Sequence, residues 1–398
     1  MKYYSIKIIS LLFLTIIIYG CKKTEIKKYN SENEMYFTTK LNEIDGPYIY
    51  DKKDNWGVVT VEKDKNASFY IHNILVKKEN TNTFTCKVNN SDNDTFTFQI
   101  QKEYKISKAI YPAAEKIFVT SDIEGNFNAF YSMLIGNNII DKNYNWIFGN
   151  GHLVIAGDMV DRGNNAWPCL WLLYKLEQEA EKVGGKVHYI LGNHDIMNMH
   201  YNTKYVKKRY IELAKIISGK ENEKEAYAYL LSNTNEIAKW IATKNTIEKI
   251  GDVLYTHGGI SIDMVNANLT IDQINEIVRK NIRNNLTQNP GDNKIDNLVY
   301  SRTGPFWYRG LVKDYKQYYK KVTESDLDKI LKFYTIKHIV IGHTIVDEKV
   351  TSDFNGKVIR VDIKHPSNKF TGKSQGLLIE NNQFFTVNDD GKKKDLAF

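Results

Sequence analysis

Hydrophobic and polar positions follow two different patterns on either side of Pro112. From residue 41 to 111, short runs alternate between apolar and polar side chains and are separated by clusters of turn-forming residues. Such alternation, rich in β-branched and aromatic residues, predicts strands. The predicted strands are Trp56–Val61, Ser68–Val76, Thr83–Val88 and Thr95–Ile100. Residues 41–111 are therefore predicted to form a small antiparallel β module, in which we find no candidate catalytic residue.

After Pro112, apolar strands alternate with helical stretches. The predicted strands are Ile117–Thr120, Leu153–Ala156, Val187–Leu191, Val253–Thr256 and Ile339–Ile341. The predicted helical stretches are Phe127–Ile135, Ala166–Val183 and a long region from about 203 to 248. This order predicts an α/β domain over residues 112–398, with helices covering a buried sheet.

The first 40 residues differ from both regions. Lys2 and Lys7 flank the start of an apolar run, Ile8–Ile18, which is shorter than the roughly 20 residues that span a bilayer. Together with the following Gly20-Cys21, it resembles a bacterial lipoprotein signal peptide of residues 1–20. Cys21 would then carry the lipid, and the polar residues 21–40 would form a tether. The alternative is an uncleaved N-terminal anchor, and either one places the body outside the cytoplasm, in a bacterial cell envelope.

Composition and charge exclude several other classes of protein. Hydrophobic residues make up 42% and charged residues 26% of the 398 residues, which is typical of globular proteins. The net charge of +8 is scattered rather than clustered with aromatic residues, so we expect no nucleic-acid partner. Cys86 and Cys169 fall in different predicted domains and lack metal-ligand spacing, so we expect both to be free and buried.

Chemistry-bearing residues follow each predicted strand of the α/β domain. Every strand runs into a glycine-containing turn with a carboxylate, amide or imidazole side chain. These side chains are Asp122 and Glu124, Asp158, Asn193 and His194, His257, and His343. Because ligands of α/β sheets bind beyond the carboxyl ends of the strands, all five turns can converge on one crevice.

The types of side chain point to a pair of metal ions. Carboxylate, amide and imidazole ligands suit divalent ions such as manganese, iron or zinc. Two such ions about 3.5–4 Å apart can hold a hydroxide between them and neutralise a phosphate group. Each motif alone is weak, since a histidine at a strand end is usually a surface residue. Five motifs in order predict a two-metal centre.

The ordered motifs also resemble a known family. They are Gly-Asp-Met-Val-Asp-Arg-Gly (157–163), Gly-Asn-His-Asp (192–195), His-Gly-Gly (257–259) and Gly-Pro-Phe-Trp-Tyr-Arg (304–309). Over about residues 115–380 the chain is similar to calcineurin-like metallophosphoesterases, close to the phosphoprotein phosphatases and their bacterial Shewanella-like relatives. The resemblance implies a β-sandwich flanked by helices, with the N-terminal module outside it. Two divalent ions are expected, and the ligand types make manganese the first choice, with iron, zinc or magnesium as alternatives.

The resemblance assigns a role to each matched residue. Asp158 would bridge both ions and Asp122 would bind the first, while Asn193, His257 and His343 would bind the second. His194 would be the general acid, oriented by Asp161, and Arg162 and Arg309 would bind phosphate oxygens. Arg302 is the competitor for the role of Arg309.

One position departs from the family pattern. The first motif is usually Asp-x-His, but the chain has Asp122-Ile123-Glu124. A ligating Glu124 would favour a harder ion such as manganese or magnesium. The alternative is that Glu124 does not ligate and that the first site is weak or lost.

Three functions are consistent with these residues. The leading hypothesis is hydrolysis of phosphomonoesters, with a phosphorylated protein or a small phosphoester as substrate. The second is hydrolysis of a nucleotide anhydride, as in the dinucleoside tetraphosphatases. The third is a non-catalytic surface protein with a decayed phosphatase fold, which Glu124 favours and which intact His194, Asp161 and Arg162 oppose.

Overall fold

The computed structural model describes residues 26–31, 34–345 and 347–398. The predicted signal peptide and Cys21 lie outside the described residues. None of the helices in the described part of the chain is both long and apolar enough to cross a bilayer.

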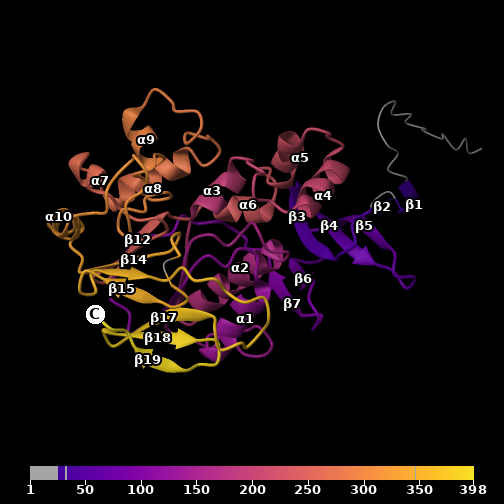
Figure 1. The fold of residues 1–398 in the computed structure, drawn as a ribbon. Helices are drawn as coiled ribbons and strands as arrows, with labels where there is room; N and C mark the ends of the chain where they lie inside the picture. The colour runs from indigo at the N-terminus through magenta and orange to yellow at the C-terminus, as the bar shows by residue number, and fades with distance from the viewer. Residues whose placement is uncertain (1–25, 32–33, 346) are drawn as a thin grey trace, which may run out of the picture.

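Two six-stranded sheets pack face to face in the larger part of the molecule (Figure 1). The first sheet has the order β11-β10-β9-β17-β18-β19, and the second has the order β15-β16-β14-β13-β12-β8. The first comprises β9 (Lys116–Thr120), β10 (His152–Ala156), β11 (Lys186–Ile190), β17 (Gln375–Glu380), β18 (Gln383–Asn388) and β19 (Lys393–Asp395). The second comprises β8 (Ile110–Tyr111), β12 (Ile247–Ile250), β13 (Val253–Thr256), β14 (His338–Ile341), β15 (Thr351–Asp353) and β16 (Val358–Arg360).

Side-chain alternation along the central strands builds two hydrophobic layers. In β9, Ile117 and Val119 point into a cluster between the two sheets, whereas Phe118 points into the core on the opposite face. Period-two alternation places successive side chains on opposite faces, so an apolar run such as Ile117–Val119 is buried on both. The inter-sheet cluster also contains side chains from β13 and β14, among them Tyr255 and Val340.

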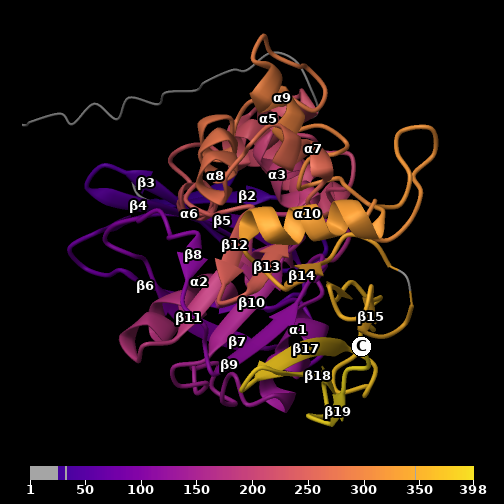
Figure 2. The same ribbon diagram turned by 90° about the vertical axis from the view of Figure 1, so that its left-hand side faces the viewer.

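Helices cover the sandwich and form its upper part (Figures 1 and 2). The helices are α1 (Phe127–Gly136), α2 (Ala166–Lys182), α3 (Asn193–Met199), α4 (Lys208–Ser218), α5 (Glu223–Leu230), α6 (Glu236–Ile241), α7 (Ile262–Asn266), α8 (Ile271–Lys280), α9 (Lys294–Val299) and α10 (Glu324–Tyr334). The α2 helix buries Trp171, Leu172 and neighbouring side chains completely. The long helical region predicted over 203–248 is divided into α4, α5 and α6, and its last residues begin β12.

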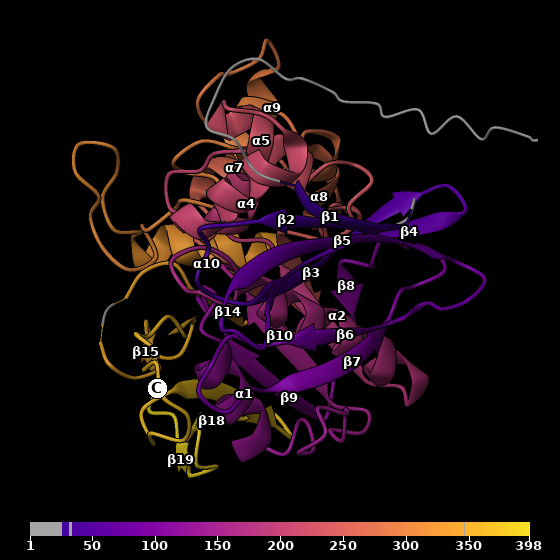
Figure 3. The same cartoon turned by 90° about the vertical axis from the view of Figure 1, so that its right-hand side faces the viewer.

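The N-terminal β module is a five-stranded antiparallel sheet with a separate hairpin (Figure 3). The sheet has the order β1-β2-β5-β4-β3, and the hairpin joins β6 and β7. The strands are β1 (Ile26–Ser31), β2 (Glu34–Thr38), β3 (Asp45–Lys52), β4 (Asn55–Lys63), β5 (Phe69–Lys77), β6 (Thr83–Lys87) and β7 (Thr95–Gln99). All of them pair antiparallel, as the pattern predicted.

The module is packed firmly on the helices. The Trp171 indole N–H donates to the Pro47 carbonyl over 2.8 Å, and the Trp171 ring stacks on Phe98 with centroids 4.1 Å apart. Arg209 of α4 forms an ion pair with buried Asp45, 2.9 Å away. Cys86 and Cys169 are both buried and free.

Two boundaries differ from the prediction. The stretch predicted as a tether, residues 21–40, contains β1 and β2, which extend the module's sheet. The edge strand β1 is lysine-rich, which edge strands tolerate, so its polar composition did not reveal it; β2 lies between β1 and β5. At the other boundary, β8 lies within residues 41–111 but pairs with β12 of the second large sheet.

Candidate metal centre and active site

The five predicted motif turns meet at one edge of the sandwich. β9, β10 and β11 are parallel neighbours in the first sheet, and β13 and β14 are parallel neighbours in the second. Their carboxyl ends therefore face the same side of the molecule. There they surround a cavity of about 850 Å³, whose lining includes Asp122, Glu124, Asp158, Arg162, Asn193, His194, Arg309 and His343.

The module also contributes to this cavity. The turn after β6 places Asn89, Asn90 and Ser91 in its wall. The Asn165 side chain donates to the Asn89 carbonyl and accepts from the Asn89 amide, over 3.2 and 3.1 Å. The wall is thus tied directly to the loop that follows Asp161 and Arg162.

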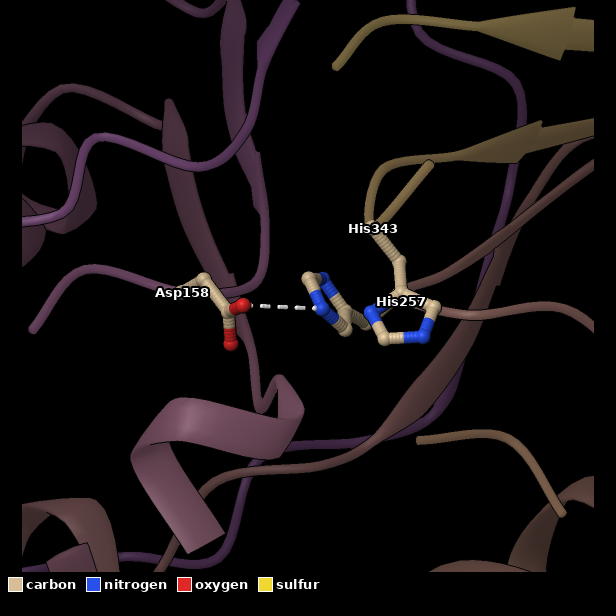
Figure 4. Close-up of side chains that lie close together, drawn as sticks. All are labelled: Asp158, His257 and His343. Atoms are coloured by element: carbon tan, nitrogen blue, oxygen red, sulfur yellow. Dashed lines mark ion pairs between the residues drawn. The ribbon is translucent and has the colours of Figure 1, made fainter. Parts of the chain in front are cut away.

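Three of the predicted metal ligands form a tight, buried group. Ligand atoms of Asp158, His257 and His343 lie within 4.8 Å of one another. Figure 4 shows the two imidazole rings turned toward each other and the Asp158 carboxylate beside His257. The Nε2 atom of His257 lies 3.1 Å from Asp158 Oδ2 and 3.0 Å from Asn193 Oδ1. The structure therefore brings together all four residues predicted around the second ion.

Hydrogen bonding prepares these side chains for a cation. With Nδ1–H of His257 donating to the Ala156 carbonyl at 2.8 Å, Nε2 faces two oxygen acceptors and can bind a cation once its proton is displaced. The buried Nε2 of His343 has no hydrogen-bond partner among the described residues. Imidazole lone pairs, a carboxylate and an amide oxygen are ligands that suit a divalent transition metal. The donor set fits the predicted ion.

The electrostatics lead to the same conclusion. Burial lowers the pKa of His257, but the adjacent Asp158 charge outweighs burial and raises this pKa to about 10. Burial and the charges of His257 and Arg309 hold the pKa of His343 well below its ordinary value. The His343 imidazole thus stays neutral. The His257 imidazole holds a proton, and its positive charge neutralises Asp158 as a metal cation would. Metal binding must displace that proton.

Left-handed backbone conformations aim the ligands at the cavity. Asp122, Asp158 and His343 have φ of 52°, 57° and 65°. Such conformations cost about 1–3 kcal/mol each and concentrate at functional sites. Gly192 permits the close approach of the chains, because a Cβ there would lie 2.2 Å from Asp158 Oδ1. Gly192 is therefore required by the packing around Asp158.

His194 has the environment of a proton donor. Its Nδ1 lies 2.6 Å from Asp161 Oδ2, and its Nε2 lies 3.0 Å from the Arg162 guanidinium. Its backbone N–H donates to Asp158 Oδ1 at 2.8 Å. Burial lowers the pKa of His194, but the charges of Asp158 and Asp161 outweigh burial and raise it. The acid form is therefore favoured beside the metal ligands.

The residues of the first predicted ion are arranged differently. Asp122 Oδ2 accepts the His343 backbone N–H at 3.1 Å. Glu124 lies near Asp158 and His194, with ligand atoms within 4.8 Å of one another, but its carboxylate forms an ion pair with Arg162. Metal ligation by Glu124 stays a prediction.

The structure distinguishes Arg309 from Arg302, its competitor for the role of phosphate-binding residue. Arg309 lines the cavity, and its guanidinium donates to the His343 carbonyl at 2.7 Å and the Thr344 hydroxyl at 2.8 Å. Arg302 instead lies over the ring of Tyr318, 4.3 Å from its centroid. The geometry thus favours Arg309 over Arg302.

Three residues near the site have no assigned role in the sequence-based prediction. Asp195 accepts the Asp158 and Gly192 backbone N–H groups at 2.9 and 2.8 Å, and so holds two motif turns together. Asn198 donates to Asp161 at 2.9 Å. Asp362 is buried in the cavity lining, and burial and the Asp122 charge raise its pKa to about 8. Asp362 follows the short strand β16 after one residue, Val361, and no glycine-containing motif marks it in the sequence.

The fold and this site define a metallophosphoesterase. The chain belongs to the calcineurin-like phosphoesterase family, whose model matches residues 115–347. The prediction of fold class and of a phosphoesterase enzyme is thereby confirmed.

Particular relatives point to a narrower branch. The chain is 31% identical over 229 residues to Shewanella-like protein phosphatase 1 of Plasmodium berghei, covering 58% of this chain and 61% of that protein. It is 26% identical over 302 residues to Shewanella-like protein phosphatase 2 of Arabidopsis thaliana, covering 65% and 73%. The predicted resemblance to Shewanella-like phosphatases is confirmed.

A solved structure is similar over most of the molecule. The crystal structure of a cold-active protein-tyrosine phosphatase from a psychrophilic Shewanella species is 31% identical, with a TM-score of 0.75. The match covers 89% of this chain and 100% of that one. A match of this extent includes part of residues 1–114, which lie outside the match to the family model, as predicted.

Proposed function

We propose that the protein is a metal-dependent phosphatase that hydrolyses phosphomonoesters on phosphorylated proteins. The observation that carries this proposal is the His194–Asp161 pair beside the Asp158, His257 and His343 group. A cation site alone would suit many proteins. A buried imidazole with an orienting carboxylate adds the proton donor that a leaving alkoxide requires.

Each side chain then has a defined task. When bound, two divalent ions supply a water-derived nucleophile and neutralise the phosphate charge. Arg162 and Arg309 bind phosphate oxygens, for which the planar guanidinium group is suited. His194 holds a proton at Nε2 and donates it to the leaving oxygen, while Asp161 fixes the orientation of the ring. We propose manganese as the preferred ion because the donor set contains oxygen and nitrogen atoms and no thiolate.

The size and the lining of the cavity support a substrate larger than inorganic phosphate. About 850 Å³ accommodates a phosphorylated side chain and flanking peptide. Lys207, Lys313 and Lys364 in the lining add positive charge around the arginines. The names of the similar proteins, protein phosphatase and protein-tyrosine phosphatase, agree with a phosphoprotein substrate. Phosphoserine, phosphothreonine and phosphotyrosine all fit the chemistry of the site.

The test compares three substrates on the purified, manganese-loaded chain. We expect turnover of p-nitrophenyl phosphate and of a phosphopeptide, with the same chain carrying Asp158→Asn as the inactive control. Substituting Asp158, a carboxylate that would hold the metal ions, should reduce kcat by orders of magnitude. If a dinucleoside polyphosphate is the only substrate turned over, the enzyme is an anhydride hydrolase. If none of the three is hydrolysed faster than by the control, the proposal is wrong.

We also propose that the protein is anchored in a bacterial cell envelope through lipid on Cys21. The apolar run and Gly20-Cys21 support this proposal. A Cys21→Ser variant expressed in bacteria should move from the membrane fraction to the soluble fraction. Retention of the variant in membranes would support an uncleaved anchor instead.

A further inference from the structure

Asp362 occupies a strand-end position equivalent to that of the predicted ligand His343. Strands β14 and β16 are parallel neighbours, with Ile341 paired to Arg360, and the Val361 N–H donates to the Ile341 carbonyl at 2.9 Å. Continuing this register sets Asp362 beside His343 at the edge of the cavity. Neighbouring strands lie about 4.8 Å apart, so the two residues are adjacent in space.

The Asp362 carboxylate is buried without a compensating donor. Only 4% of the residue is exposed, and it lines the metal-centre cavity. Within the described part of the chain, no hydrogen bond or ion pair reaches its side chain, whereas Asp158 accepts the His194 N–H and Asp195 accepts several backbone donors. A buried, unpaired carboxylate is costly unless a proton or a cation neutralises it.

The segment that carries Asp362 is fastened to the turn that carries Asp122. His365 Nε2 lies 3.2 Å from the Ser121 carbonyl, and the Asn126 side chain donates to the Pro366 carbonyl at 2.9 Å. The Asn128 side chain donates to the Ser367 carbonyl at 3.0 Å. Two segments about 240 residues apart in sequence are thus held side by side.

Asp122 and Asp362 lie on the two sides of the same short piece of backbone. The Asp122 carboxylate packs on Gly342, where a Cβ would lie 2.6 Å from Oδ2, and it accepts the His343 N–H. Asp362 adjoins His343 from β16. Glu124, the other available carboxylate, is already neutralised by Arg162.

We propose that Asp362 is a ligand of the first metal ion, together with Asp122 and Asp158, and that Glu124 instead positions Arg162. This inference rests on the proposed two-metal function. A site with three carboxylates is hard and negatively charged, so it favours manganese or magnesium over zinc. Asp362 also explains how a chain without the usual Asp-x-His motif keeps a complete first site.

Metal stoichiometry tests the assignment independently of activity. The apo chain is dialysed against Mn²⁺, and bound ions are counted by elemental analysis for the wild type, Asp362→Asn, Glu124→Gln and Asp296→Asn. Asp296 is a matched control because it is a buried carboxylate hydrogen-bonded to Asn281, outside the cavity lining. We expect two ions for the wild type, Glu124→Gln and Asp296→Asn, and one ion, or a second ion bound about 10–100-fold more weakly, for Asp362→Asn.

The outcomes separate this inference from the proposed function. If the wild type binds fewer than two ions, both are wrong. If Asp362→Asn still binds two ions with unchanged affinity, or if Glu124→Gln loses one, only the assignment of Asp362 is wrong. Should Asp362→Asn fail to fold, crystals of the manganese-loaded wild type decide the question. The proposal requires an Asp362 oxygen about 2.0–2.6 Å from an anomalous metal peak and is overturned if none is found there.

Discussion

Replacing Asp161 with asparagine isolates the contribution of its charge to the proton donor. Asp161 Oδ2 lies 2.6 Å from His194 Nδ1, and both side chains are almost fully buried. Asparagine has nearly the same shape and still accepts a hydrogen bond through its amide oxygen. The substitution therefore removes the negative charge and keeps one acceptor for the imidazole, but it loses the hydrogen bond that Asn198 donates to Asp161 Oδ1.

The magnitude follows from the burial and separation of the pair. Two unit charges about 4 Å apart at an effective dielectric constant of ~20 attract by about 4 kcal/mol. The Asp161 charge is one of the causes that raise the pKa of His194, so its removal should lower that pKa. Because the Asp158 charge also favours the imidazolium, we expect part of the elevation to remain in Asp161→Asn.

The assay is the pH dependence of kcat for two substrates. Since the protonated form of His194 donates, activity falls as pH rises through its pKa, and Asp161→Asn should move this alkaline limb to lower pH. At the alkaline end, kcat for a phosphoserine peptide should fall about 10²-fold, within the range of general-acid contributions. The decrease for p-nitrophenyl phosphate should be much smaller, because nitrophenolate leaves without needing a proton. An unmoved alkaline limb, or equal losses for both substrates, would refute the role of His194 as proton donor.

Three further predictions concern a motif glycine, a proposed phosphate-binding arginine and the ion pair between the N-terminal module and α4. Gly192→Ala should lower the free energy of unfolding by about 1–3 kcal/mol and weaken Mn²⁺ binding, because the new methyl group meets Asp158 Oδ1. Unchanged melting and titration curves would contradict this prediction. Arg309→Lys should raise KM and lower kcat about 10-fold in steady-state assays, because lysine lacks the planar guanidinium group. The control variant Arg302→Lys should leave KM and kcat unchanged. Arg209→Met should lower the free energy of unfolding in urea by about 3 kcal/mol, because buried Asp45 loses its ion-pair partner. An unchanged free energy would show that this ion pair does not hold the module in place.

The sequence predicted which side chains meet at the cavity, because these side chains follow recognisable strands. The Val253–Thr256 strand has the predicted bounds, and the strands before Asp122, Asp158 and His343 differ from prediction by a single residue at their starts. A strand pattern fixes which end of the sheet a following residue occupies. It therefore placed these side chains together without any knowledge of distances.

Other parts of the site depended on tertiary contacts that no local pattern contains. The ion pair between Glu124 and Arg162 joins two separate turns, so a motif alone could not decide whether Glu124 was free to ligate. Asp362 follows a strand of only three residues and precedes Ile363-Lys364 rather than a glycine, so its segment lacked the signal shared by the other motifs. The polar β1 strand was missed for a related reason, since an edge strand needs no continuous apolar face.

The contribution of the module's turn to the cavity wall has an evolutionary consequence. The hairpin that contains Asn89, Asn90 and Ser91 provides none of the predicted metal ligands. Every predicted ligand belongs to the sandwich domain. Insertions or substitutions in that hairpin can reshape the entrance without disturbing the inorganic centre. Substrate specificity can therefore evolve through changes in the hairpin while the predicted metal ligands and His194 stay the same.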